Sequence, residues 1–432
     1  MEETRVAVVK VNQDPPESIR DMFKRFPDIQ ARLAKCRTVF IKVNAVYFHP
    51  HLYTSEILID AVIKYIRQLD QNKLIYVMDN CSQGNFTRLC FAATGIDKVV
   101  KKNKARCLYL DEAKSVNVAL RRSSDESYQF PEILYRHLIN NRKDAFYLNM
   151  PVLKAHCQAQ LTAGLKNQMG LLYDEDRARY HNHLLHQKIV DIYHFIQPDF
   201  TLLDAIKVLS RGPMPAGKYV QELLHEKNVI IGGNDTVAVD AVAAKVLGHE
   251  PHHVKHIKLA AEQNLGRADI SDIVVLGKIP PAPQKIPWEF KSHLPESIRF
   301  VIGKEGACYE GCVGHAEQVL ELVVNEAGSP EKLAQKPLTI VAGKGLMPSQ
   351  IENLTEPIML LGQCACSEAG AIIRKKYRKV DLLDTCGRCD NILSVSLKRL
   401  GISPFALSPI SPYKVMYHFI VGKLNGLKYT LP

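Results

Sequence analysis

The chain has 432 residues, of which 46% are hydrophobic and 23% are charged. This composition is typical of a globular protein and excludes a largely disordered one, and the length predicts two or three domains. The formal net charge of +11 favours anionic partners. Because the basic residues form only short runs and no nucleic-acid-binding motif is present, we do not expect a nucleic acid as a partner.

The N-terminal segment and the cysteines indicate the compartment. The segment MEETRVAVVKVNQD lacks the basic and apolar regions of a secretory signal, and no stretch has the length needed to span a bilayer. We therefore expect a soluble, cytoplasmic protein with no membrane partner. In that reducing compartment the eleven cysteines are expected to be free, which suggests metal binding or reactive thiols rather than disulfides.

Residues 1–277 alternate between strand and helix patterns. Residues 5–11 and 36–44 have the pattern of strands, and a helical period covers 17–35 between them, so the chain opens with a βαβ unit. Further helices are predicted at 55–69, 183–196 and 236–248, and further strands at 74–80, 105–111, 145–150, 198–206, 228–233 and 270–277. This order predicts an α/β domain with an open, mostly parallel sheet and helices on both faces.

Polar side chains stand where several of these strands end. Lys42 and Asn44 end one strand, Asp79 ends the next, and Asp204 ends a later one. Each of them alone is typical of a strand-end turn. Because ligands of open α/β sheets bind beyond the carboxyl ends of the strands, we predict that these four residues together bind a substrate.

The segment that follows the predicted strand at 145–150 is rich in cationic and imidazole groups. Lys154 and Lys166 can hold carboxylate or phosphate oxygens, and His156 and His181 can donate or accept protons near neutral pH. We therefore predict that these two lysines and two histidines are catalytic. Asn167, next to Lys166, is predicted to bind the substrate.

Residues 278–297 contain five prolines and no clear period, which predicts a linker. The remaining residues, 298–432, repeat the strand and helix pattern and are expected to form a smaller α/β domain. Six of the eleven cysteines lie there, as three pairs that each precede a predicted helix: Cys308 and Cys312, Cys364 and Cys366, and Cys386 and Cys389.

These six cysteines are predicted to bind a metal. A helix N-terminus lowers the pKa of a thiol and stabilises the thiolate, and thiolates gathered at one end of a small domain favour a soft metal. The spacings CxxxC, CxC and CxxC differ from the two CxxC pairs on hairpin turns that are usual for zinc, so we prefer an iron–sulfur cluster, first of all a 4Fe–4S cluster. Zinc and a redox-active thiol pair stay open as alternatives.

Residues 39–277 resemble the domain-of-unknown-function family 362. The resemblance is carried, in order, by FIKVN, YVMDN, NMPVLKAH, LTAGLKNQMG, HQKIVDI, PDFTLLDAI, GPMPAG and GGNDTVAVDAVAAKVLG. Members of that family are often described as iron–sulfur proteins, some with ferredoxin-type modules, so the resemblance implies a cluster. This chain has no ferredoxin module, and its cysteine-containing region is similar to C-terminal extensions of some relatives.

These observations favour an oxidoreductase or electron-transfer protein. In this hypothesis the cluster exchanges electrons with a small anionic substrate or cofactor in the first domain, and a redox partner protein supplies them. A distant resemblance in general plan to nickel-pincer lactate racemase supports an alternative, an acid–base racemase or isomerase with structural cysteines. A metal-binding or ligand-binding scaffold is the third hypothesis.

Overall fold

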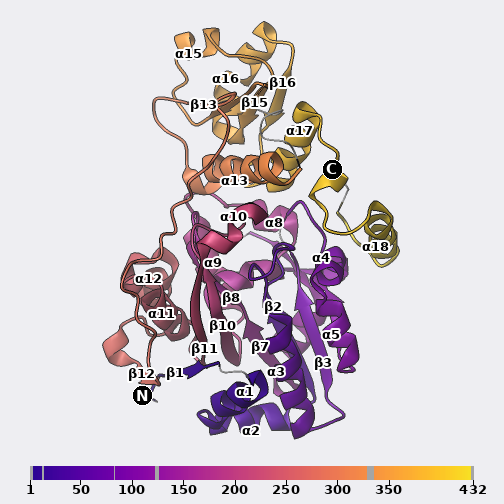
Figure 1. Ribbon diagram of the computed structural model, residues 1–432, viewed down its shortest axis with the longest axis vertical. Helices are drawn as coiled ribbons and strands as arrows, with labels where there is room; N and C mark the ends of the chain where they lie inside the picture. The colour runs from indigo at the N-terminus through magenta and orange to yellow at the C-terminus, as the bar shows by residue number, and fades with distance from the viewer. Residues whose placement is uncertain (1–2, 12–13, 82, 122–125, 328–334, 430–432) are drawn as a thin grey trace.

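The computed structural model describes residues 3–11, 14–81, 83–121, 126–327 and 335–429. Figure 1 shows a large sheet with helices on both faces and a smaller sheet built from the C-terminal residues, with helix α13 (Gly314–Leu322) between the two sheets. Within the described ranges no helix is long and apolar enough to cross a membrane.

The large sheet confirms the predicted fold class. Its strands follow the order β12-β1-β11-β10-β7-β2-β3-β4; in addition β8 pairs with β10, and β9 pairs with β8. All its pairings are parallel except β1–β11, β10–β11 and β8–β9. The strands are β1 (Arg5–Lys10), β2 (Thr38–Val43), β3 (Leu74–Asp79), β4 (Arg106–Tyr109), β7 (Ala145–Met150), β8 (Val152–His156), β9 (Gln160–Thr162), β10 (Phe200–Leu209), β11 (Leu224–Gly233) and β12 (Val274–Leu276).

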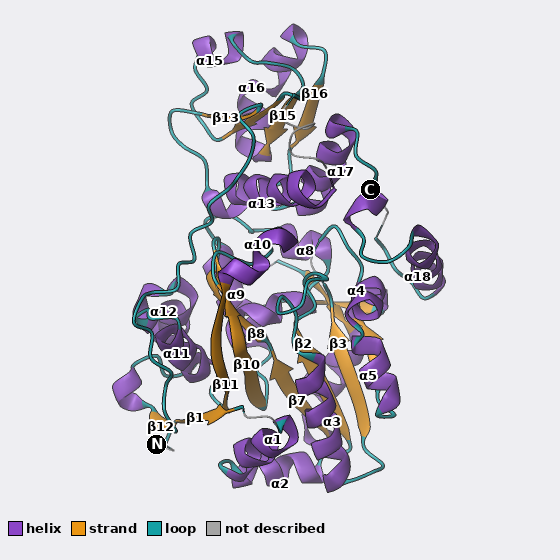
Figure 2. Ribbon diagram, in the orientation of Figure 1, coloured by secondary structure: helices purple, strands orange, loops and turns teal. Residues whose placement is uncertain are grey.

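Side chains alternate between two cores on the opposite faces of this sheet. In β2, Val39 and Ile41 pack in one core while Phe40 packs in the other. Helices cover both cores, as Figure 2 shows. One core is covered by α1 (Pro15–Lys24), α2 (Pro27–Lys35), α3 (Glu56–Leu69), α4 (Thr87–Thr94) and α5 (Ile96–Lys102), and the other by α6 (Glu132–Leu134), α9 (Leu185–Phe195), α11 (Thr236–Val246) and α12 (Lys255–Glu262).

Short elements complete the first part of the chain. β5 (Ser115–Val118) and β6 (Tyr128–Pro131) form a separate antiparallel pair. The helices that lie near the carboxyl ends of the strands are short: α7 (Gly164–Asn167), the 3-10 turn η4 (Gln168–Leu171), α8 (Asp174–Ala178) and α10 (Gly217–Val220). Of these, α7 carries two of the predicted site residues, Lys166 and Asn167.

Three predicted elements differ from the observed ones. The helical period at 17–35 is divided into α1 and α2 because Pro27 begins a new helix after Phe26, which has an extended backbone. The strands predicted at 198–206 and 228–233 are longer, and they pair antiparallel at one side of the sheet. The strand predicted at 270–277 is reduced to Val274–Leu276 because a 3-10 turn precedes it.

The C-terminal part has its own parallel sheet in the order β13-β14-β15-β16. Residues 278–297 contain no helix or strand and connect the two sheets. The smaller sheet also has cores on both faces, one against α13 and α17 and the other against α15 and α16. The elements are β13 (Ile298–Ile302), β14 (Leu338–Ala342), β15 (Ile358–Leu361), β16 (Val380–Leu383), α15 (Pro348–Glu352), α16 (Gly362–Lys376) and α17 (Cys389–Leu400).

The end of the chain returns to the first domain. After the 3-10 turn η10 (Pro404–Leu407), helix α18 (Pro412–Leu424) lies beside α4, as Figure 1 shows. Val415 of α18 packs in one apolar cluster with Phe86 and Leu89. The two parts therefore share a contact surface on which side chains from both can form a site.

Candidate functional site

A cavity of about 110 Å³ lies beyond the carboxyl ends of β2, β3 and β8. Helix α7 and the loop that follows α8 border it from the first domain, and α13 and the start of α17 border it from the C-terminal domain. All site residues predicted in the first domain, except Asp204, line this cavity: Lys42, Asn44, Asp79, Lys154, His156, Lys166, Asn167 and His181.

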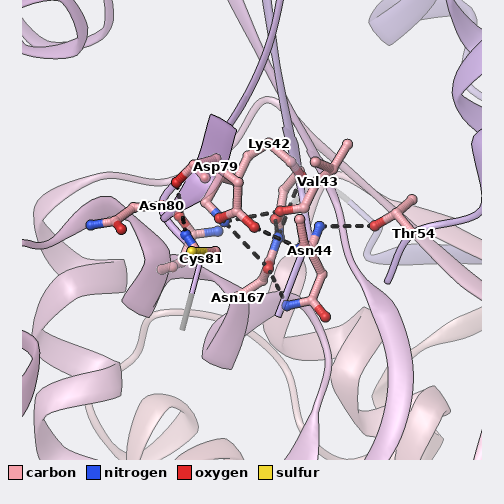
Figure 3. A network of polar contacts seen from close by, with 12 residues as sticks. Lys42, Val43, Asn44, Thr54, Asp79, Asn80, Cys81 and Asn167 are labelled. Atoms are coloured by element: carbon pink, nitrogen blue, oxygen red, sulfur yellow. Dashed lines mark hydrogen bonds and ion pairs between the residues drawn. The ribbon is translucent and has the colours of Figure 1, made fainter. Parts of the chain in front are cut away.

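A buried ion pair stands at the strand ends (Figure 3). The Lys42 ammonium lies 2.5 Å from Asp79 Oδ1 and donates to the carbonyl of Val43 at 2.9 Å. The second oxygen of Asp79 accepts the backbone N–H of Ala45 at 2.6 Å. Burial lowers the pKa of Lys42, and the adjacent carboxylate opposes that shift. The pair joins β2 to β3 at the point where both strands end.

Two asparagines extend this network to Lys154. Asn167 Oδ1 accepts from the Lys42 ammonium at 3.5 Å and from Asn44 Nδ2 at 3.3 Å. The Lys154 ammonium donates to Asn44 Oδ1 at 2.8 Å and to the carbonyl of Leu52 at 2.7 Å. Burial and the positive charge of Lys166 lower the pKa of Lys154 to about 7. Its amine is therefore divided between the charged and neutral forms at neutral pH.

Lys166 is half-buried and lines the cavity without such hydrogen bonds. Within the described residues its ammonium has no hydrogen-bond or ion-pair partner. Burial and the nearby guanidinium of Arg177 lower the pKa of Lys166 to about 8. Arg177 lines the same cavity and donates to the carbonyls of Asn80 and Cys81, and a carboxylate oxygen of Asp174 lies 3.7 Å from it. Cationic groups thus outnumber carboxylates around the cavity.

Three neutral histidines face the cavity. His156 Nδ1 accepts two backbone N–H groups at 3.2 Å, which places its proton on Nε2. His181 Nδ1 donates to the carbonyl of Glu310 at 2.9 Å, and His315 Nδ1 donates to the carbonyl of Gly311 at 3.1 Å. Burial lowers the pKa of all three rings. The cavity therefore has one imidazole N–H donor, on His156, and two imidazole acceptors, on His181 and His315.

Two buried aspartates support the site from outside the cavity. Asp204 accepts the backbone N–H of Ser55 at 3.0 Å and that of Ile206 at 3.2 Å, which fixes the start of α3. Asp240 of α11 accepts the N–H groups of Gly164 and Leu165 at 2.7 and 2.9 Å. Asp240 therefore holds the first turn of α7, which carries Lys166 and Asn167 into the cavity.

Some residues that line the cavity were not predicted from the sequence to belong to the site. Arg177 lies in the cation-rich segment, but nothing in the sequence separates it from its exposed neighbours. His315 and Gln318 come from α13, so the second domain contributes to the site. Cys389, predicted from the sequence as a metal ligand, lines the same cavity from the start of α17. The position of His315 three residues after Cys312 is the only signal that could have suggested it.

Three of the six C-terminal cysteines converge. The Cys312 side chain interacts with the sulfurs of Cys308 and Cys386, and this hydrogen bonding lowers the pKa of Cys308 to about 7 and that of Cys386 to about 6. The Cys312 thiol also lies 3.7 Å from the carbonyl oxygen of Leu361, to which it donates. The backbone N–H of Gln363 at the start of α16 lowers the pKa of Cys386 further. A Cβ on Gly362 would stand 2.6 Å from Cys312 Sγ and 3.4 Å from Cys386 Sγ, so glycine leaves the space these thiols occupy.

The other three cysteines lie apart from this thiol cluster of Cys308, Cys312 and Cys386. Cys364 is exposed and Cys366 is half-buried in the first two turns of α16, while Cys389 lines the cavity. All eleven cysteines are free thiols. In the part of the chain that the structure describes, no group of three or more His, Cys, Asp or Glu side chains is arranged to hold a metal ion.

Comparison with protein-family models supports the resemblance that the sequence motifs indicated. The family model described as Domain of unknown function (DUF362) matches residues 39–245. The match confirms the predicted resemblance over these residues, which are slightly less than half of the chain. The match includes every predicted site residue from Lys42 to Asp204 and none of the six C-terminal cysteines. No curated protein matches the chain.

The thiol cluster lies directly against the DUF362 domain. The position of a Cβ on Gly311 is 2.8 Å from Cys308 Sγ and 3.1 Å from the carbonyl oxygen of His181. A Cβ on Gly387, which has φ +71°, would stand 2.7 Å from the Cβ of His181. Two glycines thus allow the cysteine loops to touch the backbone of a cavity residue, and the thiols and the cavity have a common wall.

Gly170 of the DUF362 domain gives a test of the buried ion pair. An added Cβ would lie 2.6 Å from Lys42 Nζ and 2.7 Å from Asp79 Oδ1. We expect Gly170→Ala to displace the pair and to lower the free energy of unfolding by about 1–3 kcal/mol, measured by urea denaturation. Gly370→Ala is the control, since its methyl group meets only the side chain of Leu382, at 3.2 Å, and a helical alanine is favourable. Equal losses in the two variants would contradict the expectation.

Proposed function

We propose that the protein is an iron–sulfur oxidoreductase that acts on a small anionic substrate bound in the cavity. The observation that carries the proposal is the common wall of the thiol cluster and the cation-rich cavity. A redox group next to a substrate site is the arrangement that electron exchange between them requires. An electron-transfer reaction accounts both for the thiols of the C-terminal domain and for the cation-rich cavity of the first domain.

The charges of the cavity support an anionic substrate. Lys154 and Arg177 are buried there and Lys166 is half-buried, while Asp79, the carboxylate on the cavity wall, already pairs with Lys42. Taking a cation out of water is costly, and this cost lowers the pKa of Lys154 and that of Lys166. A carboxylate or phosphate group between Lys166 and Arg177 offsets it and accepts the hydrogen bonds that Lys166 has to give.

The thiol cluster supports an iron–sulfur group as the redox centre. Cys308, Cys312 and Cys386 are soft donors, two of them have lowered pKa values, and the N-terminus of α16 stabilises the thiolate of Cys386. Cys364 or Cys366, in the first turns of the same helix, would complete a set of four when a cluster binds. When bound there, an iron–sulfur cluster supplies or accepts single electrons.

The histidines supply the proton transfers that accompany reduction or oxidation. The Nε2–H of His156 is free to donate to a substrate oxygen, because the Nδ1 of that ring is already occupied. The Nε2 atoms of His181 and His315 accept hydrogen bonds, and both rings belong to the wall nearest the thiols. A proton can thus be given on one side of the substrate and taken on the other.

An acid–base isomerase is the second candidate, favoured by the pKa of Lys154. A lysine with a pKa of about 7 can serve as a base at neutral pH, and the Nε2–H of His156 can act as the opposing acid. In that case serine at Cys308, Cys312 and Cys386 leaves the activity unchanged in protein that folds. Loss of activity in the same variants favours the oxidoreductase.

Anaerobic reconstitution with iron and sulfide tests the redox centre. We expect about four iron and four sulfide per chain, with a charge-transfer band that bleaches on reduction. Cys308→Ser, Cys312→Ser and Cys386→Ser are each expected to reduce the iron content strongly, whereas Cys107→Ser, a half-buried cysteine of β4, is not. A colourless protein, or one that takes up a single zinc ion at the same thiols, would contradict the proposal.

The pH dependence of anion binding tests the cavity. An anion prefers the charged amine, so bound sulfate raises the pKa of Lys166 above its value of about 8. The affinity for sulfate is therefore highest below pH 7 and falls as pH rises to about 9, because each amine must then take up a proton to bind. Calorimetry should show a weaker and flatter profile for Lys166→Gln. The exposed Lys98→Gln should match the wild-type protein, and a pH-independent affinity in the wild type would exclude Lys166 as the anion ligand.

A further inference from the structure

A second, larger cavity adjoins the cation-rich one. It has a volume of about 320 Å³ and shares Gln83, Met214 and Cys389 with the first cavity. These three residues form the boundary between the two spaces. The two cavities are therefore adjacent, with Met214 and Cys389 on the walls of both.

The wall of the second cavity is apolar. Its described lining residues include no Lys, Arg, Asp, Glu or His. Phe86 of the DUF362 domain and Tyr429 near the chain end place their ring centroids 5.8 Å apart on this wall. Leu393 and Leu397 of α17 line it from the cysteine domain. Polar and apolar binding groups are thus separated into two neighbouring spaces.

The size of the second cavity sets the size of its occupant. A cavity of about 150 Å³ lined by apolar side chains is enough to bind benzene, so this one has room for an apolar group about twice that large. Ligand sites commonly combine such an apolar space with a few polar groups that fix the orientation. Here those polar groups are Lys154, Lys166 and Arg177 across the boundary.

We propose that the substrate is an amphipathic anion, with its carboxylate or phosphate group in the cation-rich cavity and an alkyl chain or ring system in the apolar cavity. This inference rests on the anion site of the proposed function and adds the class of substrate to it. The reacting part of the molecule lies beside His156 and the thiol wall, while the apolar part supplies binding energy at a distance from it. Uncharged lipids and small dianions without a tail each fill only half of the site.

Binding of straight-chain carboxylates tests the inference on the wild-type protein. Calorimetry at pH 7, below the micelle concentration of each probe, compares acetate, butanoate, hexanoate, octanoate and decanoate. We expect the affinity to increase by about fourfold for each methylene group that enters the apolar cavity and to level off when the cavity is full. Decanol, which lacks the charge, is expected to bind at least about tenfold more weakly than decanoate.

Two variants test which cavity binds the apolar chain and which binds the anionic group of the ligand. Leu393→Trp fills the apolar cavity and is expected to remove the chain-length dependence while sulfate binding stays unchanged. Leu424→Trp, on a leucine of α18 that is 83% exposed, is the matched control. Lys166→Gln is expected to weaken sulfate and decanoate alike, by about tenfold or more. If Leu393→Trp does not fold, Leu407→Trp serves the same purpose, because Leu407 lines the apolar cavity and not the cation-rich one.

The failures of the two proposals are distinct. Equal affinity from acetate to decanoate, with sulfate still bound, overturns the amphipathic substrate and leaves the anion site standing. Chain-length dependence that persists in Leu393→Trp and in Leu407→Trp overturns it too, because the tail then binds elsewhere. Absence of binding by sulfate and by every carboxylate overturns the anion site and the inference that rests on it.

Discussion

The contact between the Lys42 ammonium and the Asp79 carboxylate is the interaction on which the site depends. It satisfies two buried charges at the ends of adjacent strands, so the single carboxylate on the cavity wall is already neutralised. Through Asn167 and Asn44 the same network holds Lys154 in place. Lys154, Lys166 and Arg177 are left with a surplus of positive charge, and an anionic ligand balances it. The cavity is expected to prefer an anion because the Asp79 carboxylate is paired with Lys42 and does not balance the other cations.

The site forms only when both domains are present. Asp240 fixes the turn that carries Lys166, while Gly311 and Gly387 bring the cysteine loops against His181. The C-terminal domain adds His315 and Cys389 to the cavity and provides one wall of the apolar space beside it. The family match ends at residue 245, so the thiols beside the cavity come from residues outside the matched region.

Much of the first domain's share in the site was predictable from the sequence. Parallel strands end at one edge of a sheet, so Lys42, Asn44 and Asp79 had to lie close together once their strands were recognised. Asp204 also ends a predicted strand but turns to the start of α3, because backbone N–H groups there need an acceptor. Strand position alone does not distinguish a cavity residue from a residue that caps a helix.

The residues that the second domain contributes to the site could not be predicted from the sequence. Helix periodicity does not show that α13 turns His315 toward another domain, and cysteine spacing does not show which thiols converge. Gly362 and the loops around it decide that Cys308, Cys312 and Cys386 meet while Cys389 faces the cavity. Long-range packing of this kind depends on the whole interface, whereas strand-end chemistry depends on a few neighbouring residues.

The central claim is that the thiol cluster and the anion cavity are one site. The most direct test is the electron paramagnetic resonance spectrum of the reconstituted, reduced protein, recorded without and with saturating sulfate. We expect sulfate to change the spectrum of the wild-type protein, because the anion binds next to the thiol wall, and to leave the spectrum of Lys166→Gln unchanged. Identical wild-type spectra at a sulfate concentration shown by calorimetry to fill the cavity would contradict a common site.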